Sequence, residues 1–237
     1  MLSKLGYCSR SRAFELIHAG RVAVNGKIAR NPETPVHMGR DRIQVDGAGL
    51  PSTEKIYLVL NKPRGVITTA SDEKGRETVY HLLDSDLPWV APVGRLDKAS
   101  EGLLLLTNDS EWAARITSPE THLDKTYHVQ IASLADELLL SMLARGVKEP
   151  SGERLQAKRA RILRQGEKNT WLEIILDEGR NRQIRRILAA LNIEILRLIR
   201  VAIGPLLLGS LAKGNSRQLT NAEKEILDVA MKRATGR

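Results

Sequence analysis

The sequence predicts an α+β protein whose larger domain is built on a mixed, largely antiparallel sheet. Three short apolar runs, at residues 56–60, 103–106 and 171–176, are bounded by turn-forming residues, which is typical of well-buried strands. Stretches with helical periodicity are fewer, and they do not alternate regularly with the strands. Because a doubly wound parallel sheet requires regular alternation, this order of elements favours antiparallel pairing.

The N-terminal stretch, residues 1–48, predicts a separate small module with twice as many basic as acidic residues. Ser9 is suited to cap a short helix over 10–17, which Gly20 ends. The dipeptide Asn25-Gly26 between two short β-prone runs predicts a two-residue hairpin turn. Only Met1 and residues 2–5 precede Gly6, so any helix before the capped one is short.

A change of composition marks the boundary between the two domains. Residues 46–53 are rich in glycine, proline and small polar residues, which is the composition of a linker. We therefore expect a linker at residues 49–55 and a main domain over residues 56–237.

Further elements of the main domain follow from their local patterns. Apolar and polar residues alternate over 127–131, which predicts another strand. Residues 133–145 have a helical pattern that ends at Gly146. The sequence Thr220-Asn221-Ala222-Glu223 is a capping box that predicts the start of a last helix.

A helix is also predicted after Gly179. At about 100° per residue, one side of this helix carries Ile184, Ile187, Leu188 and Leu191, while Arg182 and Arg186 fall on the other side. Arg185 lies at the border of the apolar stripe, where a partly buried arginine can reach a cleft. The alternative is the solvated basic face of an ordinary surface helix.

The composition restricts the classes of function. No apolar run approaches the roughly 18 residues of a membrane-spanning helix, and the chain starts without the apolar stretch of a secretory signal. We therefore expect a cytoplasmic protein without a membrane partner, and a monomer is the default. The net charge of +9 favours a polyanionic partner such as RNA or DNA, and the few aromatic residues do not support a multi-base stacking surface.

Neither a metal nor a cofactor is expected. The single cysteine, Cys8, excludes an internal disulfide, and the five histidines show no metal-ligand spacing with it. The chain also lacks the glycine-rich motifs that bind dinucleotides or nucleoside triphosphates.

Residues 92–109 form the stretch with the most chemical information. Gly94 and Gly102 permit sharp backbone geometry on both sides of Asp97, and a leucine run follows. The pattern places a carboxylate at the mouth of a core strand. From the pattern alone, however, an aspartate in such a loop is more often a turn former or a salt-bridge partner.

Several motifs together carry a family resemblance. The pattern G-R-L-D-x-x-S-x-G-L-L-L-L-T-N-D at 94–109 resembles the signature of pseudouridine synthases, specifically of the ribosomal RNA branch known as RsuA/RluB. Further matches occur in the expected order along the chain: N-K-P-R-G-V at 61–66, K-T-Y at 125–127 and E-G-R-N-R-Q-I-R-R at 178–186. The pattern at 8–26 resembles the alpha-L RNA-binding module named after ribosomal protein S-four.

This resemblance implies roles for individual residues. Asp97 matches the essential catalytic aspartate, Tyr127 the tyrosine that stacks on the target base, and Arg185 the basic residue that pairs with the aspartate. A carboxylate in a cleft loses hydration, and a guanidinium within a few ångströms keeps it ionised and oriented. The alternative for Tyr127 is a tyrosine that is simply packed in the core.

The resemblance also implies that basic side chains contact RNA. The residues concerned are Arg10, Arg12, Arg21 and Lys27 in the module, and Lys62 and Arg64 around the cleft, for which turn residues are the alternative. Arg95 is a further candidate, and the helical placement leaves Arg182 and Arg186 free to meet phosphates. For Arg95, a structural salt bridge is the alternative. A basic run of Lys158, Arg159, Arg161 and Arg164 is either a solvated strand face or a further RNA contact.

The function implied is the cofactor-free isomerisation of specific uridines to pseudouridine, with ribosomal RNA or a ribosomal assembly intermediate as partner. Asp97 then acts on the sugar, either as a nucleophile at C1′ or as a base that removes a 2′ proton. One alternative is a non-catalytic RNA-binding or assembly factor on the same fold. A carboxylate-dependent hydrolase needs a second carboxylate near Asp97, for which Glu101 and Asp109 are available.

Overall fold

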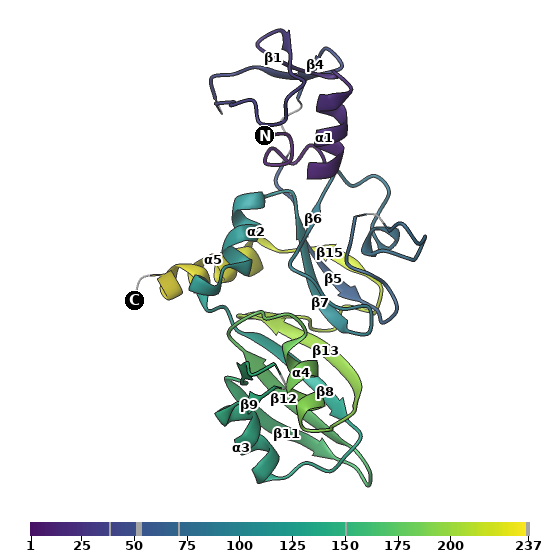
Figure 1. The fold of residues 1–237 in the computed structure, drawn as a ribbon, viewed down its shortest axis with the longest axis vertical. Helices are drawn as coiled ribbons and strands as arrows, with labels where there is room; N and C mark the ends of the chain where they lie inside the picture. Colours follow the sequence, from purple (N-terminus) through teal and green to yellow (C-terminus); the bar gives the residue numbers. More distant parts are fainter. Residues whose placement is uncertain (38, 51–53, 71, 150, 236–237) are drawn as a thin grey trace.

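The computed structural model describes residues 1–37, 39–50, 54–70, 72–149 and 151–235. Figure 1 shows a small N-terminal module at one end of the long axis and the larger domain below it. Among the described helices, none combines the length and the apolar character that crossing a membrane requires.

The N-terminal module consists of one helix and a small antiparallel sheet with the strand order β2-β1-β3-β4. Ser9 caps the helix by accepting a hydrogen bond from the backbone N–H of Arg12, as predicted. Asn25 and Gly26 have φ angles of 52° and 81°, which confirms the predicted hairpin turn. The elements are α1 (Arg10–His18), β1 (Val22–Val24), β2 (Lys27–Ile28), β3 (Ile43–Val45) and β4 (Ala48–Gly49).

The predicted linker, residues 49–55, starts one residue too early, because Gly49 is part of strand β4. Asp46 and Gly47, with φ angles of 54° and 79°, form a second tight turn, and it joins β3 to β4. Gly49 therefore belongs to the sheet of the module together with residues 46–48, while residues 51–53 of the predicted linker lie outside the described residues. Before α1, residues 2–6 form turns rather than a regular helix.

The main domain contains one nine-stranded mixed sheet, with the order β11-β12-β8-β13-β7-β5-β15 along its main path. All of its strand pairs are antiparallel except that of β13 with β7. The predicted, largely antiparallel sheet is therefore confirmed. Its strands are β5 (Tyr57–Lys62), β6 (Ala91–Val93), β7 (Glu101–Thr107), β8 (Lys125–Ile131), β11 (Arg159–Gln165), β12 (Thr170–Leu176), β13 (Ile195–Ile203), β14 (Leu206–Leu207) and β15 (Ser216–Gln218). A separate pair is formed by β9 (Val147–Lys148) and β10 (Arg154–Leu155).

The helices of the main domain are α2 (Ser110–Thr117), α3 (Glu137–Arg145), α4 (Gln183–Ala190) and α5 (Asn221–Thr235), with the 3-10 turns η1 (Val79–Leu82) and η2 (Pro119–Thr121). The predicted capping box is present, because the Thr220 hydroxyl accepts from the backbone N–H of Glu223 at 3.1 Å and the Glu223 carboxylate accepts from the backbone N–H of Thr220 at 2.9 Å. Helix α3 begins four residues after the predicted start, because Asp136 provides its cap.

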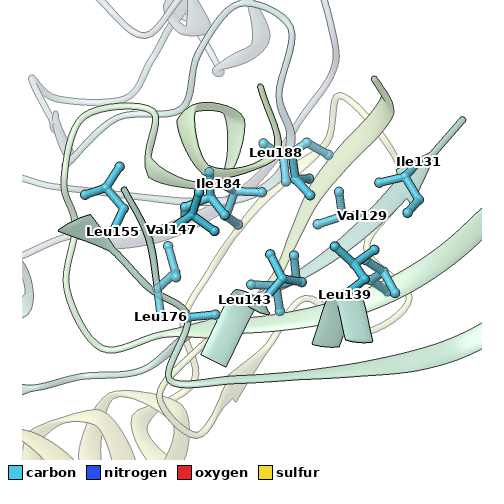
Figure 2. Close-up of a cluster of buried hydrophobic side chains, with 14 of the residues drawn as sticks. Val129, Ile131, Leu139, Leu143, Val147, Leu155, Leu176, Ile184 and Leu188 are labelled. Atoms are coloured by element: carbon cyan, nitrogen blue, oxygen red, sulfur yellow. The ribbon is translucent and has the colours of Figure 1, made fainter. Parts of the chain in front are cut away.

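One hydrophobic cluster fixes α4 on the sheet. Figure 2 shows Ile184 and Leu188 of this helix on one side of the cluster, with Leu139 and Leu143 of α3 on the opposite side. The predicted apolar side of α4 is buried at positions 184, 187 and 188. This packing sets the position and rotation of the helix, and hence the direction from which Arg185 approaches its neighbours.

The parallel pairing of β13 with β7 depends on Gly102. This glycine has a φ of 101°, and a Cβ atom there would lie 2.2 Å from the carbonyl oxygen of Arg200. No side chain fits in that space, so only glycine lets the two backbones approach. Asp97 lies in the loop before β7, and this close approach of the two backbones brings the loop next to β8 and β13.

Candidate active site

The backbone of the Asp97 loop is held by a buried lysine. Lys62 has no exposed surface, and its ammonium donates to the carbonyl oxygens of Pro63, Asp97 and Ser100 at 3.0, 3.1 and 2.8 Å. Burial lowers the pKa of Lys62 to about 8, although the negative charges of Asp97 and Glu101 oppose that shift. The prediction that Lys62 contacts RNA is therefore wrong, because all three donors are used inside the protein.

The carboxylate of Asp97 meets the guanidinium of Arg185, as predicted. The Arg185 Nε atom lies 3.2 Å from Asp97 Oδ2, and its Nη2 donates to the Ala99 carbonyl and the Ser100 hydroxyl, both at 3.1 Å. The side chains of Asp97 and Arg185 are 29% and 16% exposed. Burial lowers the pKa of Arg185, and the charge of Asp97 opposes that shift. The guanidinium is thus fixed to both the side chain and the backbone of the Asp97 loop.

Asp97, Tyr127 and Arg185 line one cavity with a volume of about 240 Å³. Tyr127 is half-buried and packs against two hydrophobic clusters of the core, which supports the interpretation of a packed tyrosine; its stacking on a base stays a prediction. The cavity places an aromatic ring, a carboxylate and a guanidinium around one space. We call Asp97, Tyr127 and Arg185 the cavity triad.

Arg182 and Arg95 line the same cavity with exposed side chains. Arg182 precedes α4 with a left-handed φ of 49°, so it does not share a helix face with Arg186 as the periodicity predicts. Its Nη1 atom lies 3.8 Å from Asp97 Oδ2, and its side chain is 54% exposed. Arg95 is exposed and lines the cavity, and no ion pair is found for it within the described part of the chain. Both remain available to a polyanion.

Arg186 is not available to phosphates, and that prediction is wrong. Its Nε atom donates to the Glu149 carboxylate at 2.8 Å, and its Nη2 pairs with both Glu149 and Glu153. These two carboxylates raise the pKa of Arg186. The residue ties α4 to the segment that contains the β9–β10 pair.

The other basic residues predicted to contact RNA are exposed. Arg10 and Lys27 face solvent and form no ion pair with a described residue, whereas Arg12 pairs with Glu15 at 2.8 Å and Arg21 with Asp46 at 2.5 Å. Arg64 is exposed and donates to the Leu196 carbonyl at 3.4 Å. Their contacts with RNA stay predictions.

Within the basic run of residues 158–164, several side chains have intramolecular partners. Lys158 pairs with Asp124 at 2.7 Å and Arg161 with Glu173 at 2.6 Å, while the Arg164 guanidinium lies 5.2 Å from the centroid of the Trp171 ring. These contacts support the interpretation of this run as a strand face.

Three cationic residues of the cavity are not among the site residues predicted from the sequence, and one of them, Arg180, pairs with Glu153 and Glu178. The other two are Lys125 of β8 and Arg200 of β13. The sequence signal that could have identified Arg200 is its position as a charged residue within the predominantly apolar stretch 195–203.

In the part of the chain that the structure describes, no group of three or more His, Cys, Asp or Glu side chains has the geometry of a metal site.

The comparison with known families agrees with this geometry. Residues 56–190 match the family model described as RNA pseudouridylate synthase, and residues 1–43 match the S4 domain. The chain belongs to the RNA pseudouridylate synthase family. The family resemblance of the motifs is thereby confirmed.

Relatives and a solved structure cover nearly the whole chain. The "Ribosomal large subunit pseudouridine synthase B" of Bacillus subtilis is 38% identical over 94% of this chain and 91% of the relative. An "Uncharacterized RNA pseudouridine synthase" of Aquifex aeolicus is 39% identical over 94% of this chain and 89% of the relative. A crystal structure of a pseudouridylate synthase, 33% identical, superposes with a TM-score of 0.67 and covers 95% of this chain and 96% of its own.

Proposed function

We propose that this protein isomerises uridine to pseudouridine in ribosomal RNA, with Asp97 as the catalytic carboxylate and without a cofactor. The observation that carries the proposal is the contact of 3.2 Å between Asp97 and Arg185 in the cavity that Tyr127 also lines. The ribosomal RNA substrate is supported by the name of the Bacillus subtilis relative, by the S4 domain and by the net charge of +9. Action as a cytoplasmic monomer stays a prediction.

The reaction exchanges the N1–C1′ bond of uridine for a C5–C1′ bond, so the detached base has to turn without leaving the protein. The target nucleotide must first leave its stack, as for other enzymes that act on a base. In the cavity the base then lies against Tyr127 while its ribose reaches Asp97. Two routes fit this placement: attack of the carboxylate on C1′, or removal of the 2′ proton.

Arg185 supports either route by orienting the carboxylate. The guanidinium holds Oδ2 of Asp97, so the other carboxylate oxygen, Oδ1, accepts no hydrogen bond from a described residue and can face the ribose. Charge-assisted hydrogen bonds of this kind are stronger than neutral ones and fix geometry. With their exposed side chains, Arg95 and Arg182 are placed to hold the phosphates that flank the extruded nucleotide.

The test is Asp97→Asn in the full-length protein. Single-turnover assays on ribosomal RNA transcripts, with pseudouridine mapped by carbodiimide chemistry, should show a loss of rate of about 10²–10⁴-fold or more. RNA affinity should stay within a few-fold. Asp86→Asn, in an exposed loop, is the matched control and should keep the wild-type rate.

The same mapping in cells that lack the protein identifies the target uridine. Wild-type turnover by Asp97→Asn would remove Asp97 from the reaction. A wild-type protein that binds ribosomal RNA but forms no pseudouridine would instead support the non-catalytic RNA-binding factor.

A further inference from the structure

Arg200 is a buried cation whose hydrogen bonds are incomplete. Its side chain is only 6% exposed, and its Nε atom donates to the Leu103 carbonyl at 2.7 Å. Its Nη2 atom is buried without a hydrogen-bond partner, and no described carboxylate forms an ion pair with it. Because a buried, unsatisfied charged donor destabilises a fold, its presence beside a cavity indicates a ligand that completes its bonds.

Lys125 provides a second cation on the same side of the sheet. Strand β13 lies between β8 and β7, and Arg200 is directly opposite Tyr127 on β8 and Gly102 on β7. Lys125 is two residues before Tyr127, so the two side chains share one face of β8. Lys125, Tyr127 and Arg200 all line the cavity.

Lys125 also has no hydrogen bond or ion pair from its ammonium to any described residue. Burial and the nearby charge of Arg200 lower its pKa, against the opposing influence of Asp124 and Asp177. Among the described residues, Asp97 is the one carboxylate that lines the cavity, and it is already held by Arg185 and lies near Arg182. Lys125 and Arg200 thus form a pair of cations, the cationic floor, and neither makes an ion pair with a described carboxylate.

We infer that the cationic floor, Lys125 and Arg200, binds the carbonyl oxygens of the extruded uracil ring and so selects uridine over cytidine. This inference rests on the proposed function. Uracil offers two carbonyl acceptors, O2 and O4, whereas cytosine carries an amino donor in place of O4. A cationic donor facing that amino group would remain unpaired, and a site built for an acceptor rejects such an analogue strongly.

A phosphate fits this floor less well than a base does. Arg200 is almost fully buried, whereas Arg95 and Arg182 are exposed and suited to the RNA backbone. The floor also lies next to Tyr127, the residue proposed to stack on the base. Arg200 is thus buried more deeply than the cations suited to the RNA backbone, and Lys125, which is half-buried, lies between them in exposure, so the pair suits the base better than a phosphate.

The same contacts act on the chemical step. When the N1–C1′ bond breaks, its electron pair stays on the ring, and the negative charge is shared with O2 and O4. C5 then bonds to C1′, and the proton that C5 releases is balanced by the proton that N1 takes up. Cations placed at the oxygens where this charge develops lower the barrier.

The experiment uses Lys125→Met, which keeps the apolar stem of the side chain, and Lys125→Arg, which keeps its charge. The matched control is Lys168→Met in the exposed turn between β11 and β12. We expect the saturating single-turnover rate of Lys125→Met to fall about 10²-fold. Lys125→Arg should recover most of that loss, and Lys168→Met should behave as wild type. Arg200→Lys, checked for folding by circular dichroism, tests the partner residue in the same assay.

A binding arm separates this inference from the proposed function. In the inactive Asp97→Asn background, dissociation constants are measured for one RNA with uridine and one with cytidine at the target position. The preference for uridine should shrink towards equality when Lys125 is replaced by Met. An equal loss of affinity for both RNAs would show a backbone contact and overturn the inference, as would a wild-type rate and preference. Turnover by Asp97→Asn itself overturns only the proposed role of Asp97.

Discussion

The buried ammonium of Lys62 donates a hydrogen bond to the main-chain carbonyl of Asp97, with a distance of 3.1 Å between the two atoms. The side chain of the same aspartate is held by Arg185, at 3.2 Å. One cation therefore fixes the backbone of the Asp97 loop and another fixes its carboxylate. The two cations come from β5 and α4, so the loop is braced from two sides.

Lys62→Met should reduce both the stability of the fold and the rate of isomerisation. The change leaves three carbonyl oxygens without their donor, and a loss of about 1–3 kcal/mol in the free energy of unfolding is expected. The rate should fall because the backbone of Asp97 is no longer fixed. Urea denaturation and single-turnover assays measure the two effects, and Lys168→Met serves as the control. A variant as stable as wild type would contradict the assigned bonds.

The stability difference between wild type and Lys62→Met should also depend on pH. The pKa of Lys62 is about 8 in the folded protein and has an ordinary value of 10.5. Between these two values the unfolded chain binds more protons than the folded one, so the contribution of Lys62 to stability rises with pH and is lost as pH falls towards 8. Measuring the free energy of unfolding of wild type and Lys62→Met at pH 7.5 and pH 10 checks this. A difference between the two proteins that is the same at both pH values would exclude the lowered pKa.

Arg185→Met should impair catalysis far more than RNA affinity, by about 10²-fold in the single-turnover rate. Arg185→Lys should recover little, because an ammonium cannot reproduce the fork that reaches Asp97, Ala99 and Ser100. The neighbouring Arg186→Met is the matched control. Its partners are Glu149 and Glu153, so it should lower stability and leave the saturating rate unchanged. A defect of Arg185→Met confined to affinity would refute the pairing.

Gly102→Ala should destabilise the protein by about 2–4 kcal/mol, because it adds a clash with the Arg200 backbone to a strained positive φ. Thermal and urea unfolding provide the measurement. Gly166→Ala, in a turn with ordinary contact distances and no positive φ, should change stability by less than about 0.5 kcal/mol. If both variants are destabilised equally, the close approach of β7 and β13 is not the cause.

Arg10→Gln combined with Lys27→Gln should weaken RNA binding and reduce its dependence on salt. Each bound phosphate releases counterions, so the slope of log K against log salt should fall by about one for each phosphate that the variant no longer binds. Filter binding from low to moderate salt gives the slope, with Lys168→Gln as the control. An unchanged slope would exclude these two residues as RNA contacts.

Much of the fold could be predicted because its signals are local. The Ser9 cap, the Asn25-Gly26 turn and the Thr220–Glu223 capping box depend on residues within a few positions of one another. The apolar side of α4 follows from helical periodicity alone. The hairpin at Asp46-Gly47 escapes prediction because the same residues suit a linker and a tight turn.

The errors at the site have a different origin, namely partners that are distant in the sequence. Lys62 meets carbonyls 35 and 38 positions away, and Arg186 meets carboxylates 37 and 33 positions away. Nothing in the local pattern distinguishes these residues from free surface cations. Lys125 and Arg200 become neighbours only through the register of β13 against β8, which no single-strand pattern encodes.

Strand β13 is synthesised after both β7 and β8, yet it is inserted between them. A nascent chain that ends before residue 195 already contains the whole cavity triad, but the sheet that carries it is still in two unjoined pieces. The two pieces of the sheet, and with them the two sides of the cavity, are therefore joined only when this late central strand pairs with both β7 and β8.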